Sequence, residues 1–327
     1  MSRVSFPYNV SFLLMPDAAI AAAGPAWVIP APRERRFARF AWAVLAYNLA
    51  VVLWGAYVRA TGSGAGCGNH WPLCDGPVSP QTPAGATIIE FTHRATSALD
   101  VMLVAALLIW AFARYPKRHR VRLGAMLSAV FLVTEALLGA SLVLLDHVAR
   151  NASANRAWSL SAHLINTLTL LACLTLTAWW GMGRPAIRLR GGGAGMAAVT
   201  LVVFAVLGVS GAIAALGDTL FPSTSLAAGL ARDFDPTANL FVRLRIWHPL
   251  MAAAASAWIL YYAVSAVSSA VGRRLSYAVL ALVGGQLAAG AINLLLLAPI
   301  GMQLVHLLLA DLLWIALVLL SAERLQA

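Results

Sequence analysis

The sequence predicts an all-α integral membrane protein with eight transmembrane helices, arranged as two pseudo-repeated four-helix bundles. The composition indicates the membrane: 61% of the residues are hydrophobic and 11% are charged, whereas a soluble domain carries about a quarter charged residues. The mean hydropathy of +0.80 agrees with this. The third observation is that histidines recur near the starts of apolar segments in both parts of the chain.

Eight segments are long and apolar enough to cross a bilayer, whose hydrocarbon core needs about 20 apolar residues. The first six are residues 39–58, 87–112, 122–145, 157–181, 194–217 and 244–268. The last two come from one apolar run, 275–321, which is too long for a single span. Pro299 and Gly301 interrupt this run, so we expect the turn between the two spans there.

Basic residues predict the orientation. Residues 1–38 are rich in proline and end in an arginine cluster, which predicts a mostly disordered cytoplasmic N-terminal tail. With that tail inside, most of the 23 Lys and Arg residues fall on the cytoplasmic side. We therefore expect a multi-pass protein of the cell (inner) membrane with both termini in the cytoplasm. The basic inner loops also explain the net charge of +11, so nucleic acid is not expected as a partner.

Residues 39–182 and 183–327 are predicted to be two similar halves. In each half a long outer loop leads into a segment that opens with a histidine, His93 in the first half and His248 in the second. His163 and His306 lie near the outer starts of two further segments. Four helices followed by four parallel helices is the simplest interpretation, and such repeats build two similar sites.

These four histidines are the main candidates for functional residues. Each is expected within about two helical turns of the outer face, roughly 5–10 Å deep. One histidine alone would be explained by an interhelical hydrogen bond, but four at one depth indicate a cofactor. Imidazole is an axial ligand of haem, and facing helices can clamp a porphyrin. We therefore pair His93 with His163, and His248 with His306, as ligands of two haem irons near the outer face.

Glu90 makes the two halves chemically different. It stands three residues before His93 and shares its helical face. It is either a partner for Arg94 or a group that handles protons or stabilises a developing cation beside a haem. The corresponding segment of the second half carries no carboxylate, which assigns catalysis to the first half and electron transfer to the second. A zinc or copper site ranks lower, because only Glu90 offers an additional ligand.

The outer loops carry further candidates. Cys67 and Cys74 predict a disulfide that either staples a glycine-rich loop or relays reducing equivalents. His70 and His147, in or beside these loops, receive no role. Four arginines near the outer ends of segments either pair with haem propionates or snorkel to the interface: Arg59, Arg94, Arg243 and Arg245.

Two stretches resemble a known family. VRATGSGAGC and WPLC followed by IIEFTHR resemble the signature of the haem A synthase family, and GDTLFP followed by VRLRIWHP is similar to its second-half pattern in one branch. The resemblance covers residues 40–321. It implies a membrane haem-dependent oxidoreductase that oxidises the ring methyl group of haem O to a formyl group, giving haem A for terminal oxidases.

The resemblance also implies roles for individual residues. His93 and His163 would bracket the substrate haem, Glu90 would be catalytic, and His248 and His306 would ligate the cofactor, haem b. Cys67 and Cys74 match the cysteine pair of the first loop. A second pair, present in some members, has no counterpart in residues 218–243, which leaves a relay through two pairs without support here.

Partners and rival functions remain open at this point. The resemblance makes haem O the substrate and makes a haem O synthase and oxidase assembly factors candidate partners, with a homo-oligomer as an open alternative. One rival function is a bis-histidine di-haem electron-transfer protein of the membrane. The other is a haem carrier or transporter.

Overall fold

The structure is a computed structural model that describes residues 32–74, 84–188, 192–267 and 269–326. The predicted tail lies outside these residues as far as residue 31. Within the described residues the chain forms helices and no strand. The helices are α2 (Pro32–Ala60), η2 (Ser63–Ala65), α3 (Gly85–Arg114), α4 (Arg120–Leu144), α5 (Ala154–Gly181), α6 (Gly192–Leu220), α7 (Leu226–Asp233), α8 (Leu240–Arg245), α9 (Trp247–Ser265), α10 (Ala270–Leu295) and α11 (Ile300–Arg324).

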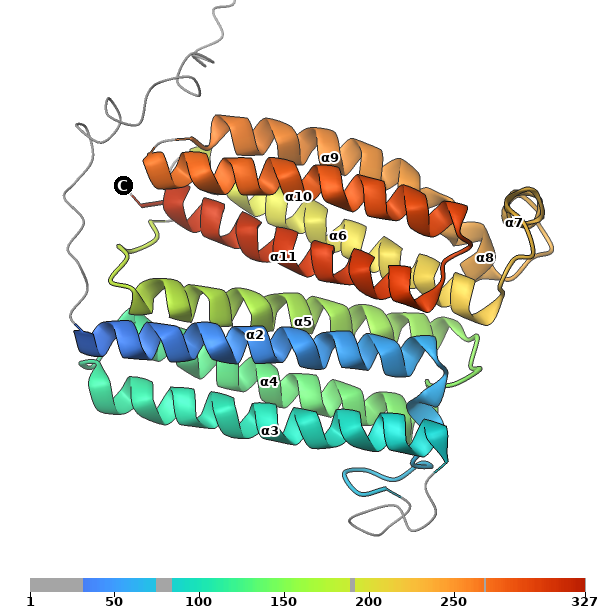
Figure 1. The fold of residues 1–327 in the computed structure, drawn as a ribbon, viewed down its shortest axis with the longest axis horizontal. Helices are drawn as coiled ribbons and strands as arrows, with labels where there is room; N and C mark the ends of the chain where they lie inside the picture. The colour runs from blue at the N-terminus through green and yellow to red at the C-terminus, as the bar shows by residue number, and fades with distance from the viewer. Residues whose placement is uncertain (1–31, 75–83, 189–191, 268, 327) are drawn as a thin grey trace, which may run out of the picture.

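The long helices run roughly parallel and gather in two groups (Figure 1). Helices α2 to α5 form one group, and α6, α9, α10 and α11 form the other. Helix α2 begins and α11 ends at the same end of the molecule, while the short helices α7 and α8 lie at the opposite end (Figure 1). The start of the first long helix and the end of the last long helix therefore lie at the same end of the described bundle.

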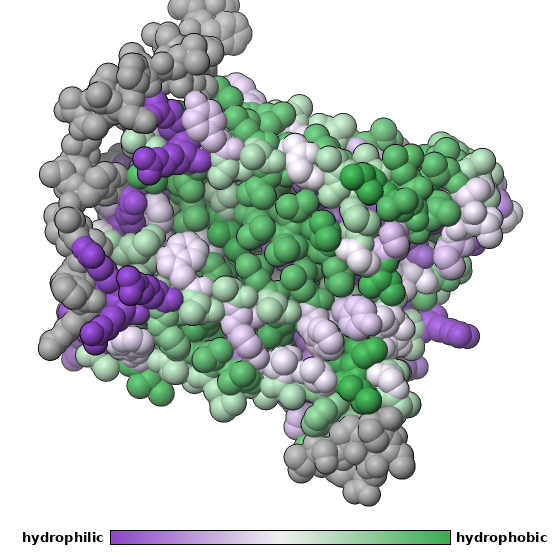
Figure 2. All heavy atoms as spheres, in the orientation of Figure 1, coloured by the Kyte–Doolittle hydropathy of each residue, from purple (hydrophilic) through white to green (hydrophobic). Residues whose placement is uncertain are grey.

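Seven of the described helices are long and apolar enough to cross a membrane: α2, α3, α4, α5, α6, α10 and α11. Large apolar side chains on them are exposed, such as Ile109 at 69% and Met102 at 60%, as expected for surfaces that face lipid. Figure 2 shows hydrophobic side chains over the middle of the visible face and strongly hydrophilic ones gathered toward its ends. The chain is therefore an all-helical, multi-pass membrane protein.

The predicted count of eight spans is not confirmed. The sixth predicted segment, 244–268, corresponds mainly to α9, which has 19 residues, begins Trp-His-Pro and is not among the seven candidate spans. The predicted segment also starts too early, because α8 ends at Arg245 and α9 begins at Trp247. The turn expected at residues 299–301 is confirmed, since α10 ends at Leu295 and α11 begins at Ile300.

The boundary of the first helix was also predicted wrongly. We expected a tail through residue 38, but α2 begins at Pro32, and Phe37 and Ala38 are 0% and 4% exposed. Proline suits the first helical turn, where its missing N–H is not needed. The ring of Phe37 packs edge-on against Trp110 and Tyr115, with centroids 5.7 and 5.1 Å apart. Tertiary packing therefore extends the helix toward the N-terminus, beyond the apolar segment that was predicted to begin at residue 39.

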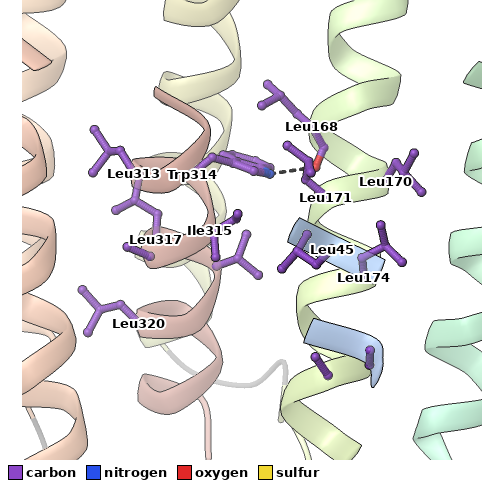
Figure 3. Packing of buried hydrophobic residues seen from close by; sticks show 14 of the residues in the cluster. Leu45, Leu168, Leu170, Leu171, Leu174, Leu313, Trp314, Ile315, Leu317 and Leu320 are labelled. Atoms are coloured by element: carbon purple, nitrogen blue, oxygen red, sulfur yellow. Dashed lines mark hydrogen bonds between the residues drawn. The ribbon is translucent and has the colours of Figure 1, made fainter. Parts of the chain in front are cut away.

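The two groups meet through α5 and α11. The indole Nε1 of Trp314 on α11 donates a hydrogen bond to the carbonyl oxygen of Leu168 on α5, at 2.7 Å (Figure 3). Leu171 and Leu317 are fully buried in the same apolar cluster. A buried donor paired across a packed apolar surface defines one relative position of the two helices. The two groups are thus held side by side.

Candidate functional site

The structure brings the four candidate histidines to one end of the molecule. His93, His163, His248 and His306 lie on α3, α5, α9 and α11, each in the N-terminal part of its helix. These four helices begin at the same end (Figure 1). The fold therefore places all four histidines toward one end of the helices, two in each group.

Each histidine ring lies against a glycine of the preceding long helix. A Cβ added to Gly55 on α2 would lie 3.0 Å from Cε1 of His93, and one added to Gly211 on α6 would lie 2.9 Å from Cε1 of His248. A Cβ on Gly290 of α10 would lie 3.0 Å from Cε1 of His306.

The fourth contact is looser. A Cβ on Gly139 of α4 would lie 3.6 Å from Nε2 of His163. At the other three positions a methyl group would crowd the ring. The glycines therefore admit imidazole rings between helices, at places where any larger residue would displace them.

The second pair of histidines is close in space. The ring centroids of His248 and His306 are 6.4 Å apart and the ring planes are nearly perpendicular, at 89°. This is an edge-to-face arrangement at the wide end of the range for ring pairs.

The ring nitrogens fit ligation of a metal in haem. Nδ1 of His248 lies 2.9 Å from Oγ of Ser210, and Nε2 of His306 lies 3.2 Å from Nε2 of Gln286. Nδ1 of His93 and Nδ1 of His306 are buried, and neither finds a hydrogen-bond partner in the described part of the chain. A buried polar atom without a partner destabilises the fold unless a ligand satisfies it. The residues present therefore suit a bound group that accepts imidazole ligands.

Glu90 is buried and fully engaged. Its Oε1 receives a hydrogen bond from Nη2 of Arg94 at 2.5 Å, and its Oε2 receives one from the backbone N–H of Cys67 at 2.8 Å. The side chain is 4% exposed. The ion pair between Glu90 and Arg94, the simpler of the two interpretations from the sequence, is thus present. The carboxylate also connects α3 to the loop that carries Cys67 and Cys74, which is called the cysteine loop below.

The cysteine loop is anchored on the first turns of α3. The Sγ atoms of Cys67 and Cys74 lie 2.12 Å apart, and both residues are buried. The hydroxyl of Thr87 donates to the carbonyl oxygen of Gly66 at 2.7 Å. A Cβ on Gly66 would lie 2.5 Å from the backbone of Ala86, so the loop approaches α3 this closely only with glycine there.

The four candidate arginines take different positions. Arg94 donates to the carbonyl oxygens of His70, Pro72 and Leu73 besides Glu90. Arg59 on α2 reaches the other group of helices, donating to the carbonyl oxygen of Ala215, to Thr219 and to Gln303.

The remaining two arginines lie on the short helix α8, in the connection between α6 and α9. Arg245 pairs with Asp218 at 3.2 Å and with Asp233 at 2.5 Å. Arg243 is exposed and makes one long contact, 3.5 Å to the carbonyl oxygen of Pro236. Of the four, Arg243 therefore has the guanidinium least engaged by the described residues.

The structure adds residues that the sequence analysis did not place in the site. Oε1 of Glu135 on α4 lies 3.8 Å from Nε2 of His163, and Gln286 occupies the comparable place beside His306. Glu135 and Gln286 each stand four residues before a glycine that contacts the same histidine, Gly139 and Gly290. Comparing the two halves position by position would have revealed this spacing. His70 meets the site only through its backbone, and His147 bonds Ser159.

Comparisons with known proteins identify relatives of the chain. The COX15-CtaA family model, described as cytochrome oxidase assembly protein, matches residues 38–318. A protein named Protoheme IX farnesyltransferase from Thermus thermophilus is 49% identical over 300 residues, which is 90% of this chain and 49% of that protein. A protein named Heme A synthase from Exiguobacterium sp. is 35% identical over 111 residues, 34% of this chain and 37% of that protein.

A second protein named Heme A synthase, from Bacillus mycoides, is 43% identical over 110 residues, 33% of this chain and 35% of that protein. The chain thus spans about half the length of the Thermus relative. It aligns with little more than a third of each of the other two.

Proposed function

The chain belongs to the COX15-CtaA family of cytochrome oxidase assembly proteins, and from this premise we propose that it is a haem A synthase. In this proposal it oxidises the ring methyl group of haem O to a formyl group. Relatives that bear the name Heme A synthase support it over about a third of the chain. The observation that carries the proposal is the set of four histidines at one end of the fold, each seated against its own glycine.

The proposal includes an architecture of eight spans in two pseudo-repeated halves, residues 39–182 and 183–327. The paired contacts support it: Gly55 with His93 corresponds to Gly211 with His248, and Gly139 with His163 corresponds to Gly290 with His306. Helix α9 would be the eighth span, since it lies beside α6 and α10 (Figure 1). The histidine sites would face the outer side of the inner membrane and both termini the cytoplasm.

In this proposal the two halves have different tasks. His93 and His163 bracket the substrate haem O, and His248 and His306 hold haem b, which supplies one-electron chemistry when bound. Ser210 orients His248 through its Nδ1, as hydrogen-bonded neighbours of metal-binding histidines commonly do. Glu90, the carboxylate one turn before His93, belongs to the first half, so catalysis is assigned there.

Glu90 is the catalytic carboxylate in this proposal. Arg94 and the N–H of Cys67 hold both of its oxygens, which fixes the negative charge one helical turn from His93. A fixed, buried carboxylate can stabilise positive charge that develops on a substrate, because it needs no reorganisation during the reaction.

Farnesyl transfer to haem is the second candidate function, because the Thermus relative is named Protoheme IX farnesyltransferase. The chain covers 49% of that protein, so its named activity can reside in the part that the alignment leaves out. A di-haem electron-transfer protein and a haem carrier are further alternatives that the paired histidines also suit.

Haem chromatography of the purified protein distinguishes these functions. We expect haem b together with haem O, haem A or a hydroxylated intermediate when the host supplies haem O. Conversion of haem b and farnesyl diphosphate to haem O would favour the transferase. Two haem b per chain with or without a haem O supply would favour electron transfer, and exchangeable haem without a formyl product would favour a carrier.

Copurification with a haem O synthase or oxidase assembly factors would test the proposed partners.

Replacement of Gly211 by alanine is expected to weaken the affinity for haem b about tenfold, as disturbance of the groups that orient a metal ligand does. The added Cβ would lie 2.9 Å from Cε1 of His248 and displace its ring. Haem per chain measured from pyridine haemochrome spectra checks this. Gly284→Ala is the matched control, because a Cβ at Gly284 meets nothing within 4 Å. Equal haem loss in both variants would contradict a specific role for Gly211.

We also propose that Cys67 and Cys74 form a disulfide. Replacing both by serine is expected to lower the free energy of unfolding by about 2 kcal/mol, since a short loop is no longer closed in the unfolded chain. Thermal melting in detergent, with and without reductant, measures this. Cys173→Ser, the change at the free cysteine of the described chain, should leave the reductant effect in place. Identical melting of oxidised and reduced wild type would contradict the disulfide.

A further inference from the structure

We propose that Glu135 is a positioning residue of the first site that acts through His163, because its carboxylate places a negative charge beside that ring. Gln286 takes the same place beside His306 without a charge. The exchange of one carboxylate for an amide would thus set the two sites at different reduction potentials. This inference rests on the proposed binding of haem by the histidine pairs.

The carboxylate of Glu135 has a defined position. Nδ2 of Asn166 donates to its Oε2 at 2.5 Å, and the hydroxyl of Thr167 donates to its Oε1. Asn166 is itself held by the carbonyl oxygen of Phe131 at 2.8 Å and by Thr134. These donors hold the carboxylate, and its Oε1 lies 3.8 Å from Nε2 of His163, a distance suited to an ion pair and too long for a hydrogen bond. One turn of α5 therefore carries both the histidine and the groups that aim a carboxylate at it.

Gln286 repeats this position in the other half. Its Nε2 lies 3.2 Å from Nε2 of His306, and its own Oε1 is buried without a hydrogen-bond partner among the described residues. The sequences around the two residues, EALLGA and QLAAGA, place each four residues before its glycine. The two side chains have nearly the same length and shape. Charge is the property in which they differ.

A fixed negative charge favours the oxidised state of a nearby metal, which carries one more positive charge than the reduced state. In a partly buried site this interaction is weakly screened and amounts to about tenfold in the equilibrium between the two states. One tenfold change for one electron corresponds to about 59 mV. The first site is therefore expected to be the harder of the two to reduce.

Two variants of the whole chain test the inference: Glu135→Gln and Gln286→Glu. Optical redox titration in detergent measures the reduction potential of each site. Each site is measured alone, in His248→Ala/His306→Ala or in His93→Ala/His163→Ala backgrounds loaded with haem b. Glu135→Gln should raise the potential of the first site by about 59 mV, a tenfold shift, and leave the second unchanged. Gln286→Glu should lower the potential of the second site by the same amount. Electron paramagnetic resonance of the ferric state should show a changed signal only at the altered site.

The outcomes separate this inference from the proposed function. If the wild-type protein binds no haem, the proposed function itself is wrong. If both sites bind haem but neither exchange moves its potential, the positioning role is wrong and the proposed function stands. If Glu135→Gln abolishes haem binding, Gln286→Glu decides: a lower second-site potential supports the inference, and an unchanged one overturns it. A loss of thermal stability without a redox shift would show a structural role only.

Discussion

Glu90→Gln is expected to reduce haem A formation by about 100-fold or more while bound haem stays at the wild-type level. Glutamine retains an oxygen that can accept the N–H of Cys67, which Glu90 binds at 2.8 Å. It removes the negative charge that would stabilise a developing cation on the substrate. Chromatography of haems extracted from cells that also make haem O measures the product, and the spectrum of the purified protein measures bound haem.

Arg94→Gln is the matched control for this prediction. It breaks the ion pair with Glu90 and releases three loop carbonyl groups, but it keeps the carboxylate. If Glu90 acts through its charge, Arg94→Gln should retain much more activity than Glu90→Gln. Equal loss in both variants would mean that the ion pair only holds the loop. Normal haem A production by Glu90→Gln would remove Glu90 from the catalytic proposal.

His248→Ala is expected to abolish haem binding in the second half while the first half still binds haem. The ring of His248 faces His306 at 6.4 Å between centroids and is oriented by Ser210. If His248 and His306 together would hold haem b, His248→Ala would leave only one imidazole to hold it. Total haem should fall by about half, and haem A formation should stop because the protein would lack the one-electron chemistry that haem b would supply.

His147→Ala serves as the control for His248→Ala. His147 lies between α4 and α5, where its Nδ1 is 2.8 Å from Oγ of Ser159, and it is not a member of the histidine pairs. Haem content and product formation should remain unchanged in this variant. Unchanged haem content in His248→Ala would contradict the assignment of haem b to the second half. Loss of all haem in His248→Ala, with a lowered melting temperature, would indicate a folding defect. The test of the second site then falls to Gly211→Ala, whose haem content is compared with that of Gly284→Ala.

Much of the fold follows from local properties of the sequence. Runs of apolar residues and prolines locate the long helices, because an uncharged stretch of about 20 residues is stable only as a helix in a bilayer. The prediction was wrong where packing decides the boundary. Phe37 follows a cluster of charged residues and looked like part of a tail, but aromatic contacts with Trp110 and Tyr115 hold it in a helix.

Some features of the candidate site were also predictable from local sequence, whereas others depend on the packing of the helices. Spacing along one helix or loop was enough to predict the cysteine pair and to choose the four histidines as candidates, and it left an ion pair of Glu90 with Arg94 as one of two interpretations. The contacts of glycines with the histidine rings, and those of Arg59 with the other group of helices, are known only from the fold. It alone brought Glu135 on α4 to His163 on α5. Such contacts depend on how each helix is rotated against its neighbours, and that rotation is set by the packing of all the helices together.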